Sequence, residues 1–392
     1  MPGQTILKAS EDYREIDVYL KEQKIRSIFL VCDEAISFLK IDTYFKELPG
    51  RLGVDVYRFM DFQPNPRYES VAEGVRRFRE QGSDAIFAVG GGSSMDVAKC
   101  IKLYANMEEG KNYLMQPIHA NEIPLFAVPT TAGTGSESTK YAVIYYDGEK
   151  QSVTHESCIP STVLMDPTVL KTLPPYQKKS TMLDAFCHAV ESFWSVQSTD
   201  KSKAYAREAI RLILRNMDSY LDNDDNGNAN MLYAAHLAGK AINITQTTAG
   251  HAMCYKLTSL YGIAHGHAAA LCVNTLWPYM LEHMECCADP RGQCYLNEVF
   301  EELGQLMGCT APHDAPRKWN ALLDKLEMAA PLIGNMAELN ILSGSVNPVR
   351  LKNNPVQLSL PVFEMLYREI LSGKHSSQAA ESLPGEGTVL PG

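Results

Sequence analysis

The segment Ala85–Asp96, with the sequence AIFAVGGGSSMD, decides the fold that we expect for this chain. Its first five residues are apolar, which is typical of a strand buried on both faces of a parallel sheet. Gly90, Gly91 and Gly92 follow directly and lead into a helical pattern that begins near Met95. Glycines let a backbone approach a phosphate closely, and the start of a helix offers N–H groups to an anion. The segment therefore predicts a phosphate-binding loop, although a tight turn without a ligand would have the same pattern.

A second loop of the same kind follows the next strand pattern. Leu125–Val128 is apolar and leads into Thr130–Glu137, with the sequence TTAGTGSE. The hydroxyl and backbone N–H groups of this loop can hold a diphosphate and a ribose from the opposite side. Two such loops after two successive strands favour a dinucleotide as the ligand.

Short apolar runs alternate with helical stretches up to about residue 175. The expected strands are Ile28–Val31, Val54–Phe59, Ala85–Val89, Leu125–Val128 and Val163–Met165. Helical patterns lie between them at Ser70–Gln81 and Met95–Tyr104. This alternation predicts an α/β dinucleotide-binding domain with a parallel sheet over residues 1–178, with its ligands at the carboxyl ends of the strands.

Strand patterns almost disappear after about residue 178. Helical periodicity covers four stretches, which are Thr181–Val196, Ser202–Asn216, Met231–Ile242 and His267–Glu282. Asp222–Asn230 is expected to be a polar, Asn-rich break between helices. The chain should therefore continue as an all-α metal-binding domain over residues 179–375, followed by a mobile tail over residues 376–392.

Composition narrows the class of protein. A chain of 392 residues is long enough for two domains, and a net charge of −10 argues against a nucleic-acid-binding surface. The sequence contains neither a signal-peptide pattern nor a run of ~20 apolar residues, so we expect no membrane span. Ten cysteines without a C-x-x-C pair, several of them inside apolar runs, favour reduced thiols and a cytoplasmic location.

Asp33 stands just after the strand pattern Ile28–Val31. A carboxylate at that position can accept a hydrogen bond from the adenosine ribose and repel a 2′-phosphate, which favours NADH over NADPH. The same residue could simply cap a helix over Glu34–Leu39, and the sequence leaves both interpretations open.

The helical half contains a candidate metal site. Asp184 and His188 are four residues apart, which places both on one face of a helix. His251 and His265 are fourteen residues apart, and on one straight helix they would be ~21 Å from each other. Gly262 can end the helix that begins near His251 and let the chain return His265 to the same point. One carboxylate and three imidazoles fit Fe(II) or Zn(II) with a position left for substrate.

These motifs together resemble the iron-containing alcohol dehydrogenases. They are GGGSxxD at Gly90–Asp96, PTTAGTGSE at Pro129–Glu137, DAxxHAxE at Asp184–Glu191, and His251 with His265-Gly266. The resemblance runs from about residue 25 to about residue 280 and implies two domains with the active site in a cleft. It implies metal ligation by Asp184, His188, His251 and His265. It implies dinucleotide binding by Asp33, Gly90, Gly91, Gly92, Ser93, Asp96, Thr130, Thr131, Thr134 and Lys150.

The sequence departs from the family pattern at one position near the metal. Many members have a second histidine four residues after the first, and Tyr255 stands there in this chain. Tyr255 and His267 are therefore the candidate catalytic residues. Tyr255 could instead be a packed aromatic residue, and His267 could support a ligand or simply fill space.

The resemblance implies NADH- or NADPH-linked reduction of an aldehyde to a primary alcohol, reversibly, by an enzyme that we expect to be a homo-oligomer. Thr154–Ser157 and Thr248–Gly262 resemble the phosphonoacetaldehyde reductases, which implies an anionic substrate that Lys140, His155 and Lys256 could bind. The alternatives are a butanol-type dehydrogenase that acts on neutral short-chain aldehydes, a lyase resembling dehydroquinate synthase, and a nonenzymatic nucleotide-binding protein.

Overall fold

A computed structural model describes residues 3–346 and 351–372. The chain divides into two compact units, the first ending at Thr247 and the second beginning at Thr248. The predicted mobile tail, residues 376–392, lies outside the described residues.

The first unit contains a six-stranded parallel sheet in the order β1-β8-β5-β4-β2-β3. Its strands are β1 (Thr5–Lys8), β2 (Ser27–Cys32), β3 (Asp55–Phe59), β4 (Ala85–Gly90), β5 (Leu125–Pro129) and β8 (Thr162–Met165). β4 is central and buried along its whole length, as its unbroken apolar sequence predicts. The five expected strands are all present, and β1 is an additional short strand at the edge of the sheet.

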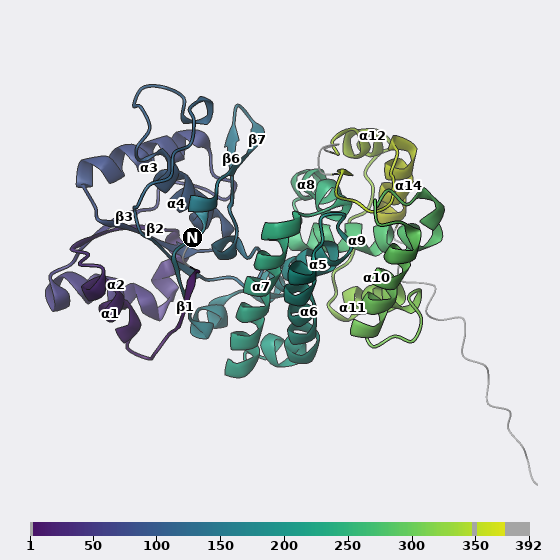
Figure 1. Cartoon of the computed structure of the whole chain (residues 1–392), viewed down its shortest axis with the longest axis horizontal. Coiled ribbons are helices and arrows are strands. Elements are labelled where there is room, and N and C mark those ends of the chain that lie inside the picture. The colour runs from purple at the N-terminus through teal and green to yellow at the C-terminus, as the bar shows by residue number, and fades with distance from the viewer. Residues whose placement is uncertain (1–2, 347–350, 373–392) are drawn as a thin grey trace, which may run out of the picture. The chain divides into compact units, whose positions relative to one another are not determined.

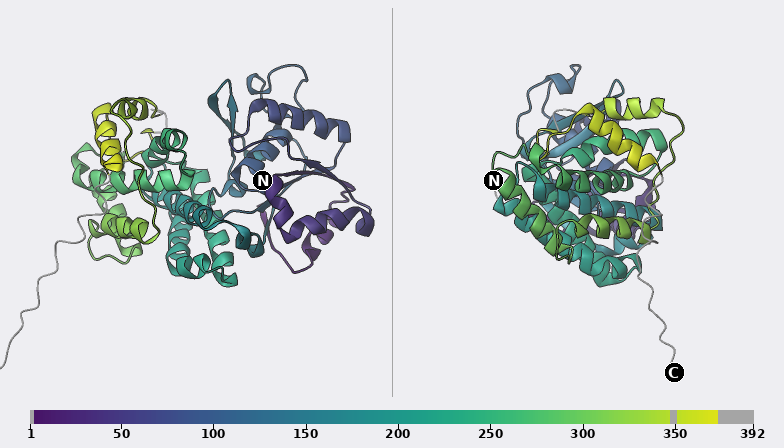
Figure 2. Two further views of the ribbon diagram at one scale, coloured as in Figure 1. Left: turned by 180° about the vertical axis from the view of Figure 1, so that it is seen from behind. Right: turned by 90° about the vertical axis from the view of Figure 1, so that its right-hand side faces the viewer.

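Helices cover both faces of this sheet. α1 (Arg14–Glu22) and α2 (Lys40–Leu52) lie on one side, and α3 (Tyr68–Gln81) and α4 (Gly92–Tyr104) lie on the other (Figure 1). The rear view in Figure 2 shows the same two layers of helices. All strands are parallel, but the side on which successive strands are added reverses at β2, because β3 pairs on one side of β2 and β4 on the other. Such a reversal is where α/β sheets bind their ligands.

A two-stranded antiparallel hairpin, β6 (Tyr141–Tyr146) and β7 (Glu149–Thr154), lies outside the main sheet. Asp147 and Gly148 form its turn with φ values of 50° and 76°. An Asp-Gly pair with positive φ is the favoured two-residue hairpin turn. The hairpin was not predicted from the sequence, although this dipeptide is a signal for it.

Three long helices complete the first unit. They are α5 (Pro175–Trp194), α6 (Asp200–Leu221) and α7 (Asp225–Thr245). The predicted break at Asp222–Asn230 is wrong in extent, because α7 begins at Asp225 after the capping side chain of Asp224. Two asparagines inside the helix have side-chain partners: Asn228 Oδ1 accepts from Lys178 Nζ at 3.2 Å, and Asn230 Nδ2 donates to Asn216 Oδ1 at 2.9 Å. Tertiary contacts thus override a weak helix propensity.

The second unit is helical. Its helices are α8 (Ala249–Tyr261), α9 (His265–Glu282), α10 (Gln293–Leu306), α11 (Asp314–Lys325), α12 (Ala337–Gly344) and α14 (Leu360–Leu371). The largely apolar α9 packs against α8, α11 and α14. Trp277 of α9 and Trp319 of α11 meet edge to face, and Trp319 Nε1 donates to the carbonyl of Ala270 in α9 at 3.2 Å. α9 is therefore the core of this unit.

Candidate metal centre and cofactor-binding loops

The two predicted cofactor loops begin at neighbouring strand ends. β4 pairs with β5 on one side and with β2 on the other, so the residues after all three strands share one edge of the sheet. Those residues are Asp33, Gly91 and Thr130. The backbone N–H of Thr130 donates to the carbonyl of Gly90 at 3.0 Å, which joins the two loops.

The second loop packs close to the glycines, most tightly at Gly92. A Cβ at Gly91 would lie 3.4 Å from Thr131 Cγ2, and a Cβ at Gly92 would lie 3.1 Å from Thr134 Cγ2. Gly92 is the first residue of α4, and Ser93, the second, is half-buried. The start of α4, with its positive dipole end, therefore lies beside the threonine hydroxyls, an arrangement suited to a diphosphate.

The structure confirms the capping interpretation of Asp33, and its role in ribose binding remains a prediction. Its Oδ1 accepts from the backbone N–H of Ala35 at 2.9 Å and so caps the short helix η1 (Glu34–Phe38). Its Oδ2 faces the first loop, because a Cβ at Gly90 would lie 3.6 Å from that atom. The cap thus orients the carboxylate toward the glycine loop.

Asp96 on α4 forms a hydrogen bond with the second loop. Ser136 Oγ donates to Asp96 Oδ1 at 3.1 Å. Burial raises the pKa of Asp96 to about 6, and the positive charges of Lys99 and, more weakly, Lys150 oppose that rise. A direct contact of Asp96 or Lys150 with a dinucleotide remains a prediction.

The first half of the predicted metal site lies on α5. Asp184 and His188 are both buried, and Asp184 Oδ1 lies 3.9 Å from His188 Nε2. Donor atoms of this pair lie within the 4.8 Å that allows two groups to share an ion. Their spacing of four residues brings them to one face of the helix, as predicted.

The second half lies at the junction of α8 and α9. Gly262 ends α8 with a φ of 67°, a left-handed conformation that glycine adopts without strain. The chain then returns, and His265 is the first residue of α9. The imidazole centroids of His251 and His265 are 5.5 Å apart. The predicted turn is thus confirmed, and two histidines that are distant in sequence become neighbours.

Tyr255 and His267 surround this histidine pair in different ways. The ring of Tyr255 stacks on that of His265 with centroids 5.4 Å apart. Burial lowers the pKa of His267, while hydrogen bonds with the backbone of Met328 and Ala329 partly offset that effect. Tyr255 is thus a packed aromatic residue beside a ligand candidate, and a catalytic role for either residue remains a prediction.

Two of the three predicted anion-binding side chains already have partners in the protein. Lys140 Nζ forms an ion pair with Glu156 Oε1 at 3.0 Å. His155 Nδ1 accepts from the backbone N–H of Ser157 at 3.2 Å. Glu156 therefore neutralises the charge that Lys140 would offer an anionic substrate.

Sequence reasoning missed two buried groups beneath the cofactor loops. Lys99 on α4 is fully buried and bonds to the segment after the second loop. His236 on α7 is also fully buried, and its Nδ1 lies 2.6 Å from Ser138 Oγ and 3.2 Å from Glu137 Oε1. The only sequence signal for Lys99 is its position three residues after Asp96 in an otherwise apolar stretch.

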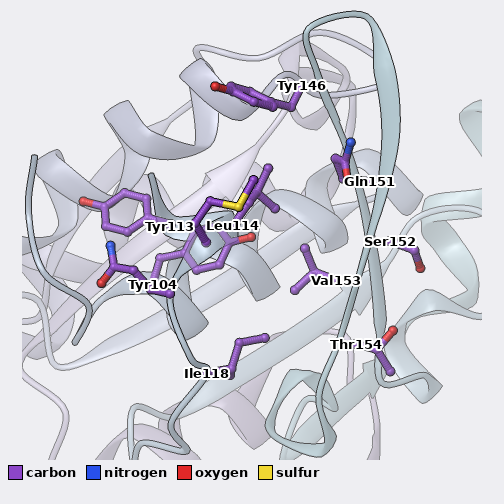
Figure 3. A pocket seen from close by; sticks show the side chains of 11 residues that line it. Tyr104, Tyr113, Leu114, Ile118, Tyr146, Gln151, Ser152, Val153 and Thr154 are labelled. Carbon is purple, nitrogen blue, oxygen red and sulfur yellow. The ribbon is translucent and has the colours of Figure 1, made fainter. Parts of the chain in front are cut away.

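A cavity of about 260 Å³ lies between the far end of α4 and the β6–β7 hairpin. Figure 3 shows Tyr104, Tyr113 and Val153 among the side chains around it. None of the predicted site residues lines this cavity. It is therefore separate from the loops at the start of α4.

Comparison with known proteins identifies the family. A family model described as "Iron-containing alcohol dehydrogenase" matches residues 3–167, and one described as "Fe-containing alcohol dehydrogenase family, C-terminal" matches residues 178–343. The chain belongs to the iron-containing alcohol dehydrogenase family. The sequence predictions of an alcohol dehydrogenase and of an α/β domain followed by helices are confirmed, and the predicted iron is confirmed at the level of the family.

Individual relatives of this alcohol dehydrogenase are named for different substrates. The phosphonoacetaldehyde reductase of Streptomyces viridochromogenes is 32% identical over 265 residues, which are 64% of this chain and 67% of that protein. The NAD-dependent methanol dehydrogenase of Bacillus methanolicus is 30% identical over 263 residues, 64% of this chain and 68% of that protein.

A solved structure supports the fold independently. The iron-containing alcohol dehydrogenase of Thermococcus thioreducens has a TM-score of 0.84 at 19% identity and covers 95% of this chain and 99% of that one. Within the described residues of the alcohol dehydrogenase, no helix combines the length and apolar character needed to cross a membrane.

Proposed function

We propose that this alcohol dehydrogenase reduces a short aldehyde to a primary alcohol, reversibly, with a divalent metal ion and a nicotinamide dinucleotide. The observation that carries the proposal is the meeting of the two loops at the start of α4, where Gly91 and Gly92 lie against Thr131 and Thr134. Family membership assigns the class of reaction. The two loops at this edge of the sheet support a nicotinamide dinucleotide as the cofactor of that reaction.

The metal ligands that we propose are Asp184, His188, His251 and His265. One buried carboxylate and three imidazoles are a donor set that suits Fe(II) or Zn(II). The α5 pair supports the proposal, because the buried carboxylate of Asp184 and the buried imidazole of His188 lie 3.9 Å apart, close enough to bind one ion. When bound, the metal supplies Lewis acidity to the substrate oxygen and the nicotinamide supplies the hydride.

The protein itself binds and orients the dinucleotide. The N–H groups at the start of α4 and the hydroxyls of Thr130, Thr131 and Thr134 would bind the diphosphate. Asp33 Oδ2, which faces Gly90, would accept from a ribose hydroxyl, and a 2′-phosphate would meet the same negative charge. We therefore propose NADH as the preferred cofactor.

For the substrate we propose an anionic aldehyde of the phosphonoacetaldehyde type. Its support is the likeness to a phosphonoacetaldehyde reductase at 32% identity. Lys140, His155 and Lys256 are the candidate anion-binding groups. To bind a phosphonate, Lys140 would have to exchange Glu156 for the substrate, and an exposed pair of this kind contributes only ~0–1 kcal/mol, so the exchange is feasible.

The second candidate is a short neutral aldehyde. The ion pair between Lys140 and Glu156 favours it, because a neutral substrate does not require that pair to open. A relative named methanol dehydrogenase at 30% identity supports it as well.

The deciding experiment compares kcat/KM for phosphonoacetaldehyde and propanal. It uses the parent enzyme and a variant with Lys140→Met, His155→Ala and Lys256→Met together. Lys111→Met is the matched control, because Lys111 also forms an ion pair with a glutamate, Glu108, at 2.7 Å but is not a predicted substrate contact.

An anionic substrate predicts a preference for phosphonoacetaldehyde that the triple variant loses and the Lys111 variant keeps. Equal kcat/KM values for the two aldehydes in the parent would refute the anionic class. The assignment as an alcohol dehydrogenase would stand in either case.

We also propose a cytoplasmic location, supported by ten cysteines that are all free thiols in the structure. A homo-oligomeric state remains a prediction from the sequence.

A further inference from the structure

Lys99 is a charged side chain with no access to solvent. It lies in the middle of α4, and its relative exposure is 0%. Its ammonium donates to Ser136 Oγ at 3.0 Å, to the Thr139 carbonyl at 2.9 Å and to the Tyr141 carbonyl at 2.7 Å. Thr139 Oγ1 lies at 3.2 Å as a further acceptor. All of these acceptors belong to the short segment Ser136–Tyr141, which directly follows the second cofactor loop.

The same helix holds the second loop at two more points. Asp96, one turn before Lys99, accepts from Ser136 Oγ at 3.1 Å. At the start of the helix, Gly92 lies against Thr134. Ser136 Oγ therefore bridges the carboxylate of Asp96 and the ammonium of Lys99, and α4 contacts the loop along three successive turns.

Burying an ammonium costs free energy of desolvation, so it is an unfavourable way to stabilise a fold. Burial lowers the pKa of Lys99, and the carboxylate of Asp96 is the main group that opposes this effect, followed by Cys158 and Glu137. An apolar side chain of the same length would fill the space without a desolvation cost. An ammonium gives instead three directed hydrogen bonds to one segment, which fix its backbone and its hydroxyl groups.

We propose that Lys99 is a positioning residue for the dinucleotide, because its ammonium fixes Ser136–Tyr141 and thereby aligns the hydroxyls of Thr130–Thr134 with the glycine loop. This inference rests on the proposed function, since it assumes that the two loops bind a dinucleotide. Lys99 is not a catalytic residue, because it is completely enclosed by protein and would touch neither the cofactor nor the substrate.

The test replaces Lys99 by methionine and uses Lys178→Met as the matched control. Lys178 is likewise buried, with 2% exposure, and its ammonium donates to the Tyr220 carbonyl at 2.6 Å and to Asn223 and Asn228. Its acceptors lie at the junction of α6 and α7, outside the segment Ser136–Tyr141 that Lys99 binds. Both variants lose a buried ammonium and its hydrogen bonds, so both should lower the midpoint of thermal unfolding.

Only Lys99→Met should weaken the binding of NADH, measured by fluorescence titration of the metal-loaded enzyme. We expect its Kd to rise about tenfold or more, because the segment that Lys99 no longer fixes has to be ordered when NADH binds. The effect should appear in KM for NADH, and saturating NADH should restore most of kcat. Both variants should contain as much metal per chain as the parent enzyme. A Kd within about twofold of the parent, or an equal loss of NADH affinity in Lys178→Met, would overturn the inference.

Ser136→Ala keeps the test decisive if Lys99→Met does not fold. It removes the hydroxyl that bridges Lys99 and Asp96 and leaves both charged groups in place. NADH affinity should fall in this variant too, and an unchanged Kd would count against the inference. If the parent enzyme itself does not bind NADH, the proposed function fails. If the parent binds NADH and the variants bind it equally well, only the role of Lys99 fails.

Discussion

Replacing Gly239 by alanine should displace the second cofactor loop, although Gly239 is not part of that loop. Gly239 lies in the middle of α7, where alanine normally stabilises a helix by about 1 kcal/mol relative to glycine. Here the new Cβ would lie 2.5 Å from the carbonyl oxygen of Gly135 and 2.9 Å from its Cα. Gly135 directly follows Thr134 in the second loop and has a φ of 58°, so its backbone has a left-handed conformation against the helix.

The structure sets the size of the effect. Nonbonded heavy atoms of this kind normally lie roughly 3.5 Å apart, so the loop or the helix has to move by about 1 Å. Overpacking of this kind costs about 1–3 kcal/mol, which exceeds or cancels the gain in helix propensity. We expect a net loss of about 0–2 kcal/mol in the free energy of unfolding, together with weaker NADH binding, because the displaced segment carries the threonine hydroxyls.

Gly50→Ala is the matched control. Gly50 also lies in a helix, α2, and a Cβ there would meet no heavy atom within 4 Å. This variant should gain about 0.5–1 kcal/mol and bind NADH like the parent. Urea unfolding and fluorescence titration with NADH give both quantities. If Gly239→Ala were as stable as Gly50→Ala and bound NADH with the parent's affinity, the close contact between the loop and α7 would be refuted.

Three further variants test other parts of the site. His251→Ala should lose the metal and turnover but keep NADH binding, and stoichiometric metal in that variant, measured by elemental analysis, would disprove the ligand assignment. Asp33→Gly should relax the ratio of kcat/KM for NADH and NADPH, and a parent that already prefers NADPH would show that Asp33 has been misread. Asp96→Asn should remove a pH dependence of stability. Because burial raises the pKa of Asp96 to about 6 from 3.8, the folded state holds the proton more tightly, and the contribution of Asp96 to stability declines as the pH rises through that window. Unfolding midpoints between those two pH values should fall less steeply in the variant, and parallel curves would contradict this account.

The parts of the fold that the sequence predicts are those with a strong local pattern. β4 and its glycine loop combine an all-apolar strand with a helix start, and few other structures fit that combination. Gly262 likewise marks the end of α8 because a left-handed residue is needed there and glycine provides it. The return of His265 to His251 follows from this single position.

The parts that the sequence did not predict depend on distant partners. β1 is a strand of only four residues, and its parallel pairing with β8, from Thr5 opposite Thr162 onward, cannot be read from its own pattern. The start of α7 depends on two distant residues: Lys178 Nζ donates to Asn228 Oδ1, and Asn216 Oδ1 accepts from Asn230 Nδ2. The burial of Lys99 could not be foreseen either, because lysine is rarely buried and its acceptors lie some forty residues further along the chain.

The most direct test of the central claim is the consumption of NADH by the purified enzyme with short aldehydes, followed by its near-ultraviolet absorbance before and after removal of the metal. We predict about one metal ion per chain, one NADH oxidised for each alcohol formed, loss of activity on chelation, and recovery on addition of Fe(II). A lyase that uses the dinucleotide only transiently would give no net consumption of NADH. Full activity after complete removal of the metal, or no net NADH oxidation with any aldehyde by the metal-loaded enzyme, would contradict the account.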